Sequence, residues 1–179
     1  MNAITRKYLI SATYLVAPTL CAAAPQLPPA RLDLIVLFLL LGYIAWRDLM
    51  ELRIPDSANL LLGLCGLAAT WAATPANLPL HAAAALIAGG GLFLISELYF
   101  RLRGRDGLGL GDVKLVAAGA LWIGPDIASA LVIATGTALG LGLCRWVRDP
   151  ASWSRPLPLG PFIALGILTM QLAATFGPL

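Results

Sequence analysis

The chain has 179 residues, of which 59% are hydrophobic and only 12% are charged, whereas soluble domains carry about 25% charged residues. This composition, with a mean hydropathy of +0.84 and a net charge of +3, excludes an ordinary soluble domain. It predicts an all-α, polytopic membrane helical bundle that forms one domain over residues 1–179, with the lipid bilayer and not nucleic acid as its surroundings.

Seven apolar stretches approach or reach the length of about 17 to 25 residues that a helix needs to cross a bilayer. The first, at residues 8–24, is either a transmembrane helix or part of a signal segment over residues 1–24, because Arg6 and Lys7 precede it and alanines end it. If it is a signal, six spans remain. The others are expected at residues 33–47, 57–74, 81–100, 112–124, 127–147 and 160–177.

Small residues are abundant in the fourth and sixth of these spans, in AAAALIAGGG (residues 82–91) and at Gly136, Gly140 and Gly142. At helical spacing, small side chains let two backbones approach closely in lipid. We therefore expect these residues at helix–helix contacts.

The basic residues indicate the orientation, since short loops rich in Lys and Arg stay in the cytoplasm. A cytoplasmic N-terminus places 11 of the 12 basic residues on the cytoplasmic side and only Arg31 outside. The C-terminus then lies outside, and the working face is the cytoplasmic one.

Metal and triad chemistry are hard to assemble from this chain. Cys21, Cys65 and Cys144 lie far apart in apolar segments, and His81 is the one histidine. Neither a Cys/His metal site nor a Ser/His triad is expected from such a set, and we predict no metal and no cofactor.

Asp48 and Asp112 stand out among the nine carboxylates because each lies at the cytoplasmic boundary of a span. An ionisable group near membrane depth costs several kcal/mol unless it is paired or functional. Two carboxylates within reach of each other share a proton, so that the ionised one activates a water and the protonated one polarises a carbonyl. This pair predicts an aspartic protease.

Gly107, Gly109 and Gly111 alternate just before Asp112. We expect them to permit positive φ angles and the close approach of an extended substrate backbone. Asp112 itself is alternatively the N-cap of the fifth span.

Three blocks together resemble the type IV prepilin leader peptidases, which are intramembrane aspartic proteases of the GxGD kind. They are WRDLMELRIPDSANL (residues 46–60), GLGLGDVKLVAAGALWIG (residues 107–124) and LPLGPFIALG (residues 157–166). The resemblance implies a catalytic pair of Asp48 and Asp112 in a protein of the bacterial inner membrane. It also implies a prepilin or pseudopilin substrate, whose basic leader is cut after a glycine at the cytoplasmic face.

Supporting roles are expected for four further residues. Gly109 and Gly111 would admit the substrate, Lys114 would orient Asp112 or contact lipid phosphate, and Glu97 would line the site. We interpret Asp56, in the first block, as the cap of the third span.

The long bacterial enzymes carry a cytoplasmic domain between their first two spans, usually with paired CxxC motifs that hold zinc and are associated with N-methylation. Here that interval is only PQLPPAR and is expected to lie outside. The resemblance therefore implies a short, protease-only form, and N-methyltransferase activity is in doubt.

Two other functions remain open. In a small proton or cation transporter subunit, Asp48 and Asp112 would form a relay; a non-catalytic pilus assembly protein would only pack against pilin helices. A conduction path requires polar groups through the membrane, and the third to sixth spans are nearly free of them between their ends. The oligomeric state is not predicted.

Overall fold

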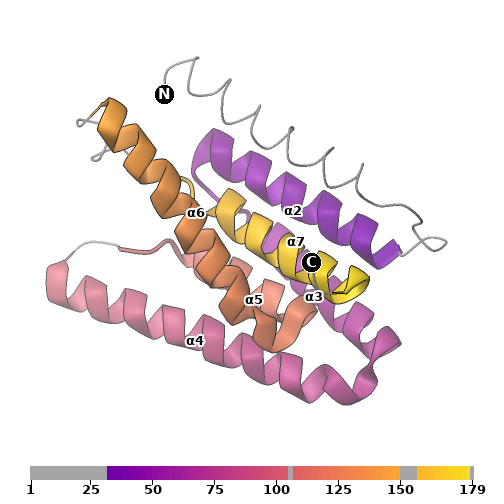
Figure 1. Cartoon of the computed structure of the whole chain (residues 1–179). Coiled ribbons are helices and arrows are strands. Elements are labelled where there is room, and N and C mark those ends of the chain that lie inside the picture. Colours follow the sequence, from indigo (N-terminus) through magenta and orange to yellow (C-terminus); the bar gives the residue numbers. More distant parts are fainter. Residues whose placement is uncertain (1–31, 105–106, 150–156, 178–179) are drawn as a thin grey trace. The chain divides into compact units, whose positions relative to one another are not determined.

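The computed structural model describes residues 32–104, 107–149 and 157–177 (Figure 1). The chain divides into two units, Met1–Leu32 and Asp33–Leu179, and the fold described here is that of the second. The expected first span, its two interpretations and Cys21 lie outside the described residues.

The described residues of the second unit form six α-helices and no strand. Each corresponds to one of the spans expected after the first, so the all-helical prediction is confirmed. Two single-turn 3₁₀ helices, η1 (Pro75–Asn77) and η2 (Gly124–Asp126), join successive helices. The α-helices are α2 (Leu32–Glu51), α3 (Asp56–Ala73), α4 (Leu78–Arg103), α5 (Leu110–Ile123), α6 (Ile127–Arg148) and α7 (Gly160–Phe176).

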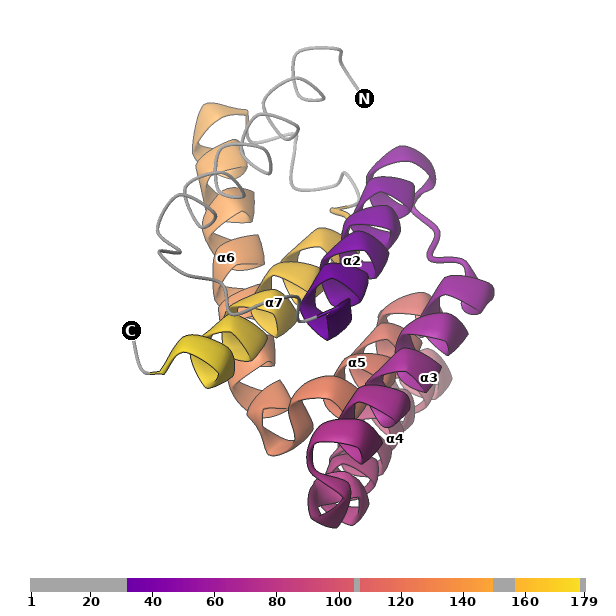
Figure 2. The ribbon, with the colours of Figure 1, turned by 90° about the vertical axis from the view of Figure 1, so that its right-hand side faces the viewer.

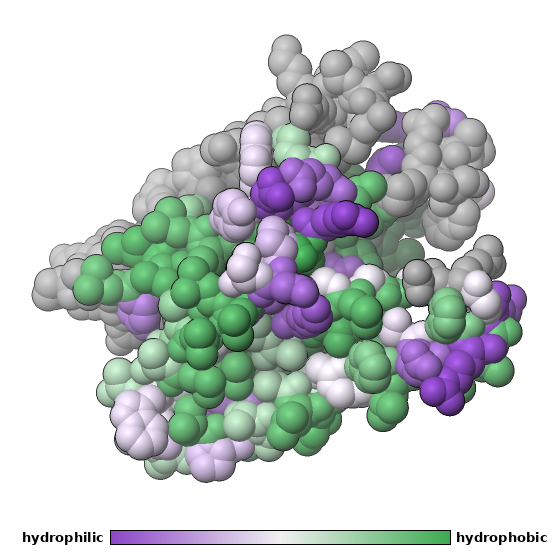
Figure 3. Space-filling model, turned by 180° about the vertical axis from the view of Figure 1, so that it is seen from behind, coloured by the Kyte–Doolittle hydropathy of each residue, from purple (hydrophilic) through white to green (hydrophobic). Residues whose placement is uncertain are grey.

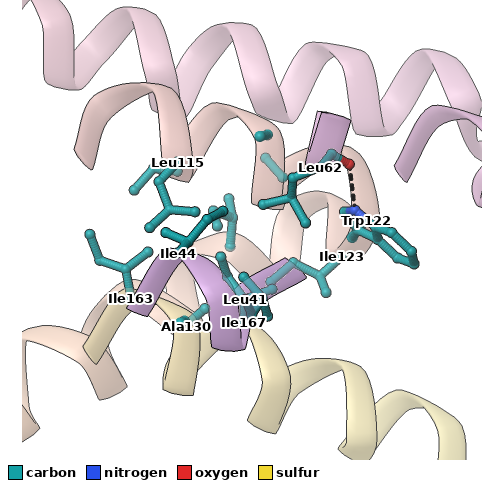
Figure 4. Packing of buried hydrophobic residues seen from close by; sticks show 14 of the residues in the cluster. Leu41, Ile44, Leu62, Leu115, Trp122, Ile123, Ala130, Ile163 and Ile167 are labelled. Carbon is teal, nitrogen blue, oxygen red and sulfur yellow. Dashed lines mark hydrogen bonds between the residues drawn. The ribbon is translucent and has the colours of Figure 1, made fainter. Parts of the chain in front are cut away.

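The short helix α5 is the centre of the packing. It contacts α3, α4 and α7, while α6 packs along α7 (Figure 2). Eight of its 14 residues are buried, which explains why α5 shows no polar face. Leu41 and Ile44 of α2 join Leu115 of α5 and Ile163 and Ile167 of α7 in one apolar cluster (Figure 4).

Trp122 fixes α5 against α3. Its indole Nε1–H donates to the carbonyl oxygen of Leu62 at 2.8 Å (Figure 4), so the ring is buried without leaving its donor unpaired. A Cβ on Gly66 would lie 2.6 Å from the ring, and glycine is therefore required beside it.

The reversal from α5 to α6 is built around the carbonyl of Leu121. The hydroxyl of Thr70 donates to this oxygen at 3.0 Å, and His81 Nδ1 lies 3.1 Å from it. Gly124 follows with a φ of 57°, and a Cβ there would meet the His81 ring at 2.7 Å. His81 thus has a structural place at this turn.

By length and composition, two helical stretches could cross a membrane: Pro75–Arg103, which is η1 with α4, and Leu110–Arg148, which is α5, η2 and α6 together. Gly160–Phe176 is a shorter apolar helix. Large apolar side chains cover much of the outer surface, including Leu86 and Ile87 of α4, which are 76% and 75% exposed. Figure 3 shows these broad hydrophobic surfaces with hydrophilic patches between them.

The glycines that bring helices together are only partly those expected. Gly89 lies against Ala117, where a Cβ would be 2.7 Å from the alanine methyl group, but Gly136, Gly140 and Gly142 have no described atom within 4 Å of a Cβ position. The expectation of helix contacts at these three is therefore not met within the described residues. The closest approaches are at Gly119, against Ile167, and at Gly166, against the backbone of Ala130.

We predict that Gly166→Ala lowers the free energy of unfolding by about 1–3 kcal/mol, because the new methyl group meets the α6 backbone, which cannot move aside cheaply. Gly136→Ala is the matched control on α6, where open space and the better helix propensity of alanine predict a change of zero to about +1 kcal/mol. Thermal unfolding of both variants in detergent measures this. Equal stabilities would contradict the described contact between α6 and α7.

Candidate active site

The second unit contains an open, polar pocket of about 570 Å³ at the C-terminal end of α2 and the N-terminal ends of α3 and α5. It combines four acidic and three basic side chains with the Gly-rich segment. Its lining residues are Arg47, Asp48, Glu51, Leu52, Arg53, Ile54, Pro55, Asp56, Gly109, Leu110, Gly111, Asp112 and Lys114. Both predicted catalytic aspartates, 64 residues apart in the chain, therefore line the same pocket.

The turn between α2 and α3 keeps Asp48 in the last turn of its helix. Leu52 has a φ of 52° and donates its N–H to the carbonyl of Asp48 at 2.9 Å. A left-handed conformation is unfavourable for a branched side chain, and here it ends α2. Pro55 then starts α3, since its fixed φ and missing N–H suit the position before the first helical residue.

Asp48 is buried, with 6% of its surface exposed. Its Oδ2 accepts a hydrogen bond of 2.9 Å from the backbone N–H of Gly160, the first residue of α7. A Cβ on Gly160 would lie 2.8 Å from the same oxygen, so only glycine brings this N–H so close. The third sequence block thus contributes directly to the site, which the sequence analysis did not predict.

Asp112 is the third residue of α5 and is half-buried. It lines the same pocket as Asp48. The N-cap of α5 is Gly109, whose carbonyl accepts the Asp112 N–H at 3.1 Å. The alternative that Asp112 caps the helix is therefore wrong, because the helix begins two residues earlier than expected.

The expected positive φ angles of Gly107, Gly109 and Gly111 are not found. These glycines instead allow close packing. A Cβ on Gly111 would lie 3.1 Å from Cβ of Ile54, and one on Gly109 would lie 3.1 Å from Oδ2 of Asp112. The absence of side chains, not unusual backbone angles, explains their presence here.

Asn59 is a second residue that the sequence analysis missed. It is 4% exposed, and its Nδ2–H donates to the carbonyl of Gly111 at 3.1 Å. Asn59 therefore ties α3 to the residue before Asp112. The sequence feature that could have indicated Asn59 is an amide side chain on an otherwise apolar helix face.

The other predicted site residues have different partners. Lys114 Nζ donates to Oδ1 of Asp56 at 2.7 Å, so it pairs with α3 and makes no described contact with Asp112. Asp56 is the first residue of α3, but Pro55 is the N-cap and no side-chain cap bond forms, which overturns its interpretation as the cap. Glu97 binds Arg101 on its own helix at 2.7 Å and does not line the pocket.

Ion pairing separates the four acids of the pocket into two classes. Glu51 binds Arg47 at 2.6 Å, as Asp56 binds Lys114, whereas Asp48 and Asp112 have no cationic partner among the described residues. In residues 32–104, 107–149 and 157–177, no group of three or more His, Cys, Asp or Glu side chains is placed to hold a metal ion. The pocket thus offers two carboxyl groups without a cationic partner among the described residues, which is a set suited to proton transfer to and from a bound water.

An all-helical, strongly apolar chain with two aspartates in one polar pocket belongs to the class of helical membrane proteins with a potential acid–base site. The sequence profile of the type IV leader peptidase family matches residues 35–144, which include both aspartates. The chain belongs to this family.

Individual relatives agree with the family. The chain is 37% identical over 122 residues to a prepilin leader peptidase/N-methyltransferase of Burkholderia pseudomallei, covering 66% of this chain and 39% of the relative. It is 30% identical over 184 residues to one of Dichelobacter nodosus (99% and 62%), and 37% identical over 87 residues to the leader peptidase HopD of Salmonella typhimurium (46% and 56%). The chain thus spans 39% to 62% of the length of these relatives. No solved structure matches it significantly.

We predict that Asn59→Asp lowers the free energy of unfolding by about 1–3 kcal/mol, because the partly buried carbonyl of Gly111 would then face an oxygen and lose a donor. Asp56→Asn, three residues earlier on the same helix, changes only an exposed ion pair and should cost less than about 1 kcal/mol. Thermal unfolding of the two variants compares them. An equal loss in both would show that the Asn59 bond does not hold the loop.

Proposed function

We propose that the protein is an intramembrane aspartic endopeptidase that removes the basic leader peptide from type IV prepilins or prepilin-like secretion proteins. The cut would follow a glycine at the cytoplasmic membrane face. The observation that carries this proposal is the shared pocket of Asp48 and Asp112, in a chain that belongs to the leader peptidase family. Relatives named as prepilin leader peptidases support the substrate class.

The chemistry needs no group beyond the two aspartates and water. One carboxylate removes a proton from water, whose oxygen attacks the peptide carbonyl, while the other carboxyl group gives its proton to the carbonyl oxygen. The tetrahedral intermediate then returns a proton to the second aspartate, and the first aspartate gives the proton that it took from water to the leaving amine. Both aspartates therefore end in their starting states. The mostly polar wall of the pocket supplies access for water.

The proposed setting is a multi-pass arrangement of seven spans in the inner membrane, with the pocket on the cytoplasmic side. The apolar surface of α4 and the distribution of basic residues support it. With 14 residues, α5 is about 21 Å long and thus shorter than the hydrocarbon core of about 30 Å. Its N-terminal end, with Asp112, would therefore lie below the ends of the longer helices, where a substrate's transmembrane segment begins.

A transporter or cation-relay subunit is less well supported. The centre of the second unit is an apolar cluster that joins α2, α3, α5, α6 and α7, and the charged residues of the described helices lie near helix ends. A relay of protons needs polar groups along its path.

We predict that Asp48→Ala and Asp112→Ala each lower the rate of prepilin cleavage by a factor of about 100 to 10,000, the usual contribution of a general acid or base. The measurement is leader removal from a purified candidate prepilin, followed by gel shift and mass spectrometry. The mass of the new N-terminus also shows whether it is methylated.

Asp56→Asn is the matched control, because it alters a carboxylate of the same pocket that already has a cationic partner. It should retain most of the activity. Full cleavage by Asp48→Ala or Asp112→Ala would overturn the role of that residue, and loss of activity in Asp56→Asn equal to theirs would show that the catalytic pair is misassigned.

The orientation predicts opposite accessibility for two exposed turns. In a variant without Cys21, Cys65 and Cys144, Asn77→Cys should react with a membrane-impermeant thiol reagent in spheroplasts, since η1 is expected outside. Arg53→Cys, beside the pocket, should react only after the membrane is permeabilised. The reverse pattern would place the pocket on the outer face and contradict a cytoplasmic cleavage site.

A further inference from the structure

The two aspartates of the pocket differ in their hydrogen bonds. Asp48 accepts the N–H of Gly160 on Oδ2, whereas no donor from the described residues reaches the carboxyl group of Asp112. The N–H belongs to the first turn of a 17-residue helix, whose N-terminal end carries a partial positive charge that favours an anion. Within the described part of the chain, only one member of the pair therefore has a fixed donor for its negative charge.

We propose that the first turn of α7 assigns the roles of the two aspartates, with Gly160 as the positioning residue. Its N–H keeps Asp48 as the ionised member, which acts as the base that activates water, and Asp112 is the member that carries the proton. This proposal rests on the proposed peptidase function.

The geometry also selects the oxygen that reacts. Oδ2 of Asp48 is occupied by Gly160, which does not line the pocket, while Asp48 itself does. Oδ1 is therefore the oxygen left for water and for the proton shared with Asp112. A hydrogen bond to a carboxylate stabilises its charged form. The bond from Gly160 to Oδ2 therefore favours the ionised form of Asp48.

Among the residues that the structure describes, the remaining charges near the pair do not replace this donor. The first turn of α7 (Gly160, Pro161 and Phe162) contributes no titratable group. Arg47 and Lys114 are each bound to another acid, and Arg53 is exposed. The charged residues that line the pocket with Asp48 are Arg47, Glu51, Arg53, Asp56, Asp112 and Lys114.

The decisive variants change the donor at position 160. Gly160→Ala adds a Cβ that meets the Asp48 carboxyl group and displaces it. Glycolic acid at position 160, introduced by semisynthesis, replaces the N–H by an ester oxygen without adding bulk. Gly166→Ala, on the same helix, disturbs packing against Ala130 but lies away from the pocket.

We expect both changes at position 160 to lower kcat by roughly 10- to 100-fold with little change in KM. Without the donor, ionising Asp48 becomes more costly, so the acidic limb of the pH–rate profile should move to higher pH. Gly166→Ala should lower the unfolding temperature but leave the acidic limb in place.

The outcomes separate this proposal from the proposed function. Cleavage by the wild-type protein together with an unmoved acidic limb in the ester variant would overturn the role of Gly160 and leave the peptidase standing. An equal shift of the limb in Gly166→Ala would also overturn it, because the effect would then follow stability and not the hydrogen bond. Failure of the wild-type protein to cleave any prepilin would overturn both.

Discussion

The hydrogen bond from Gly160 to Asp48 is the interaction around which the site is arranged. A carboxyl group buried among apolar helices is costly unless a donor satisfies it, and the donor here is a backbone N–H that α7 leaves free at its first turn. To make this bond, the end of α2 and the start of α7 must meet, although 112 residues separate them. Glycine is required because any side chain would occupy the place of the carboxylate. The glycine at position 160, in the third sequence block, is thus explained by the carboxyl group of Asp48 in the first block.

The sequence block that supplies Asp48 also positions the residue before the second aspartate. Asn59 binds the carbonyl of Gly111, and Ile54 packs against the space where Gly111 has no side chain. The stretch from Asp48 to Asn59 therefore supplies one carboxyl group and positions the loop that carries the other. The left-handed Leu52 makes this possible, because it turns the chain from α2 into α3 within a few residues.

The sequence predicted six of the helices because long apolar runs separated by charged or Pro-containing turns leave few alternatives in lipid. The sequence also predicted that Asp48 and Asp112 lie together, since each is at the cytoplasmic boundary of an expected span. It did not predict Gly160, because a backbone N–H has no signature in residue type, nor the partner of Lys114, which comes from a neighbouring helix. The glycines before Asp112 were recognised, but the sequence alone does not distinguish a positive φ from close packing, and the structure shows close packing.

The ion pairs at the rim of the pocket follow from helical geometry. Arg47 is adjacent to Asp48 in sequence, and Lys114 is two residues after Asp112, but residues one or two apart on a helix do not face each other. Arg47 instead reaches Glu51 one turn later, and Lys114 reaches Asp56 on α3. A cation bound directly to either aspartate would favour ionisation of both and remove the proton that they share. Helical geometry thus directs both cations away from the aspartates and toward Glu51 and Asp56, and it leaves the two aspartates to interact with each other.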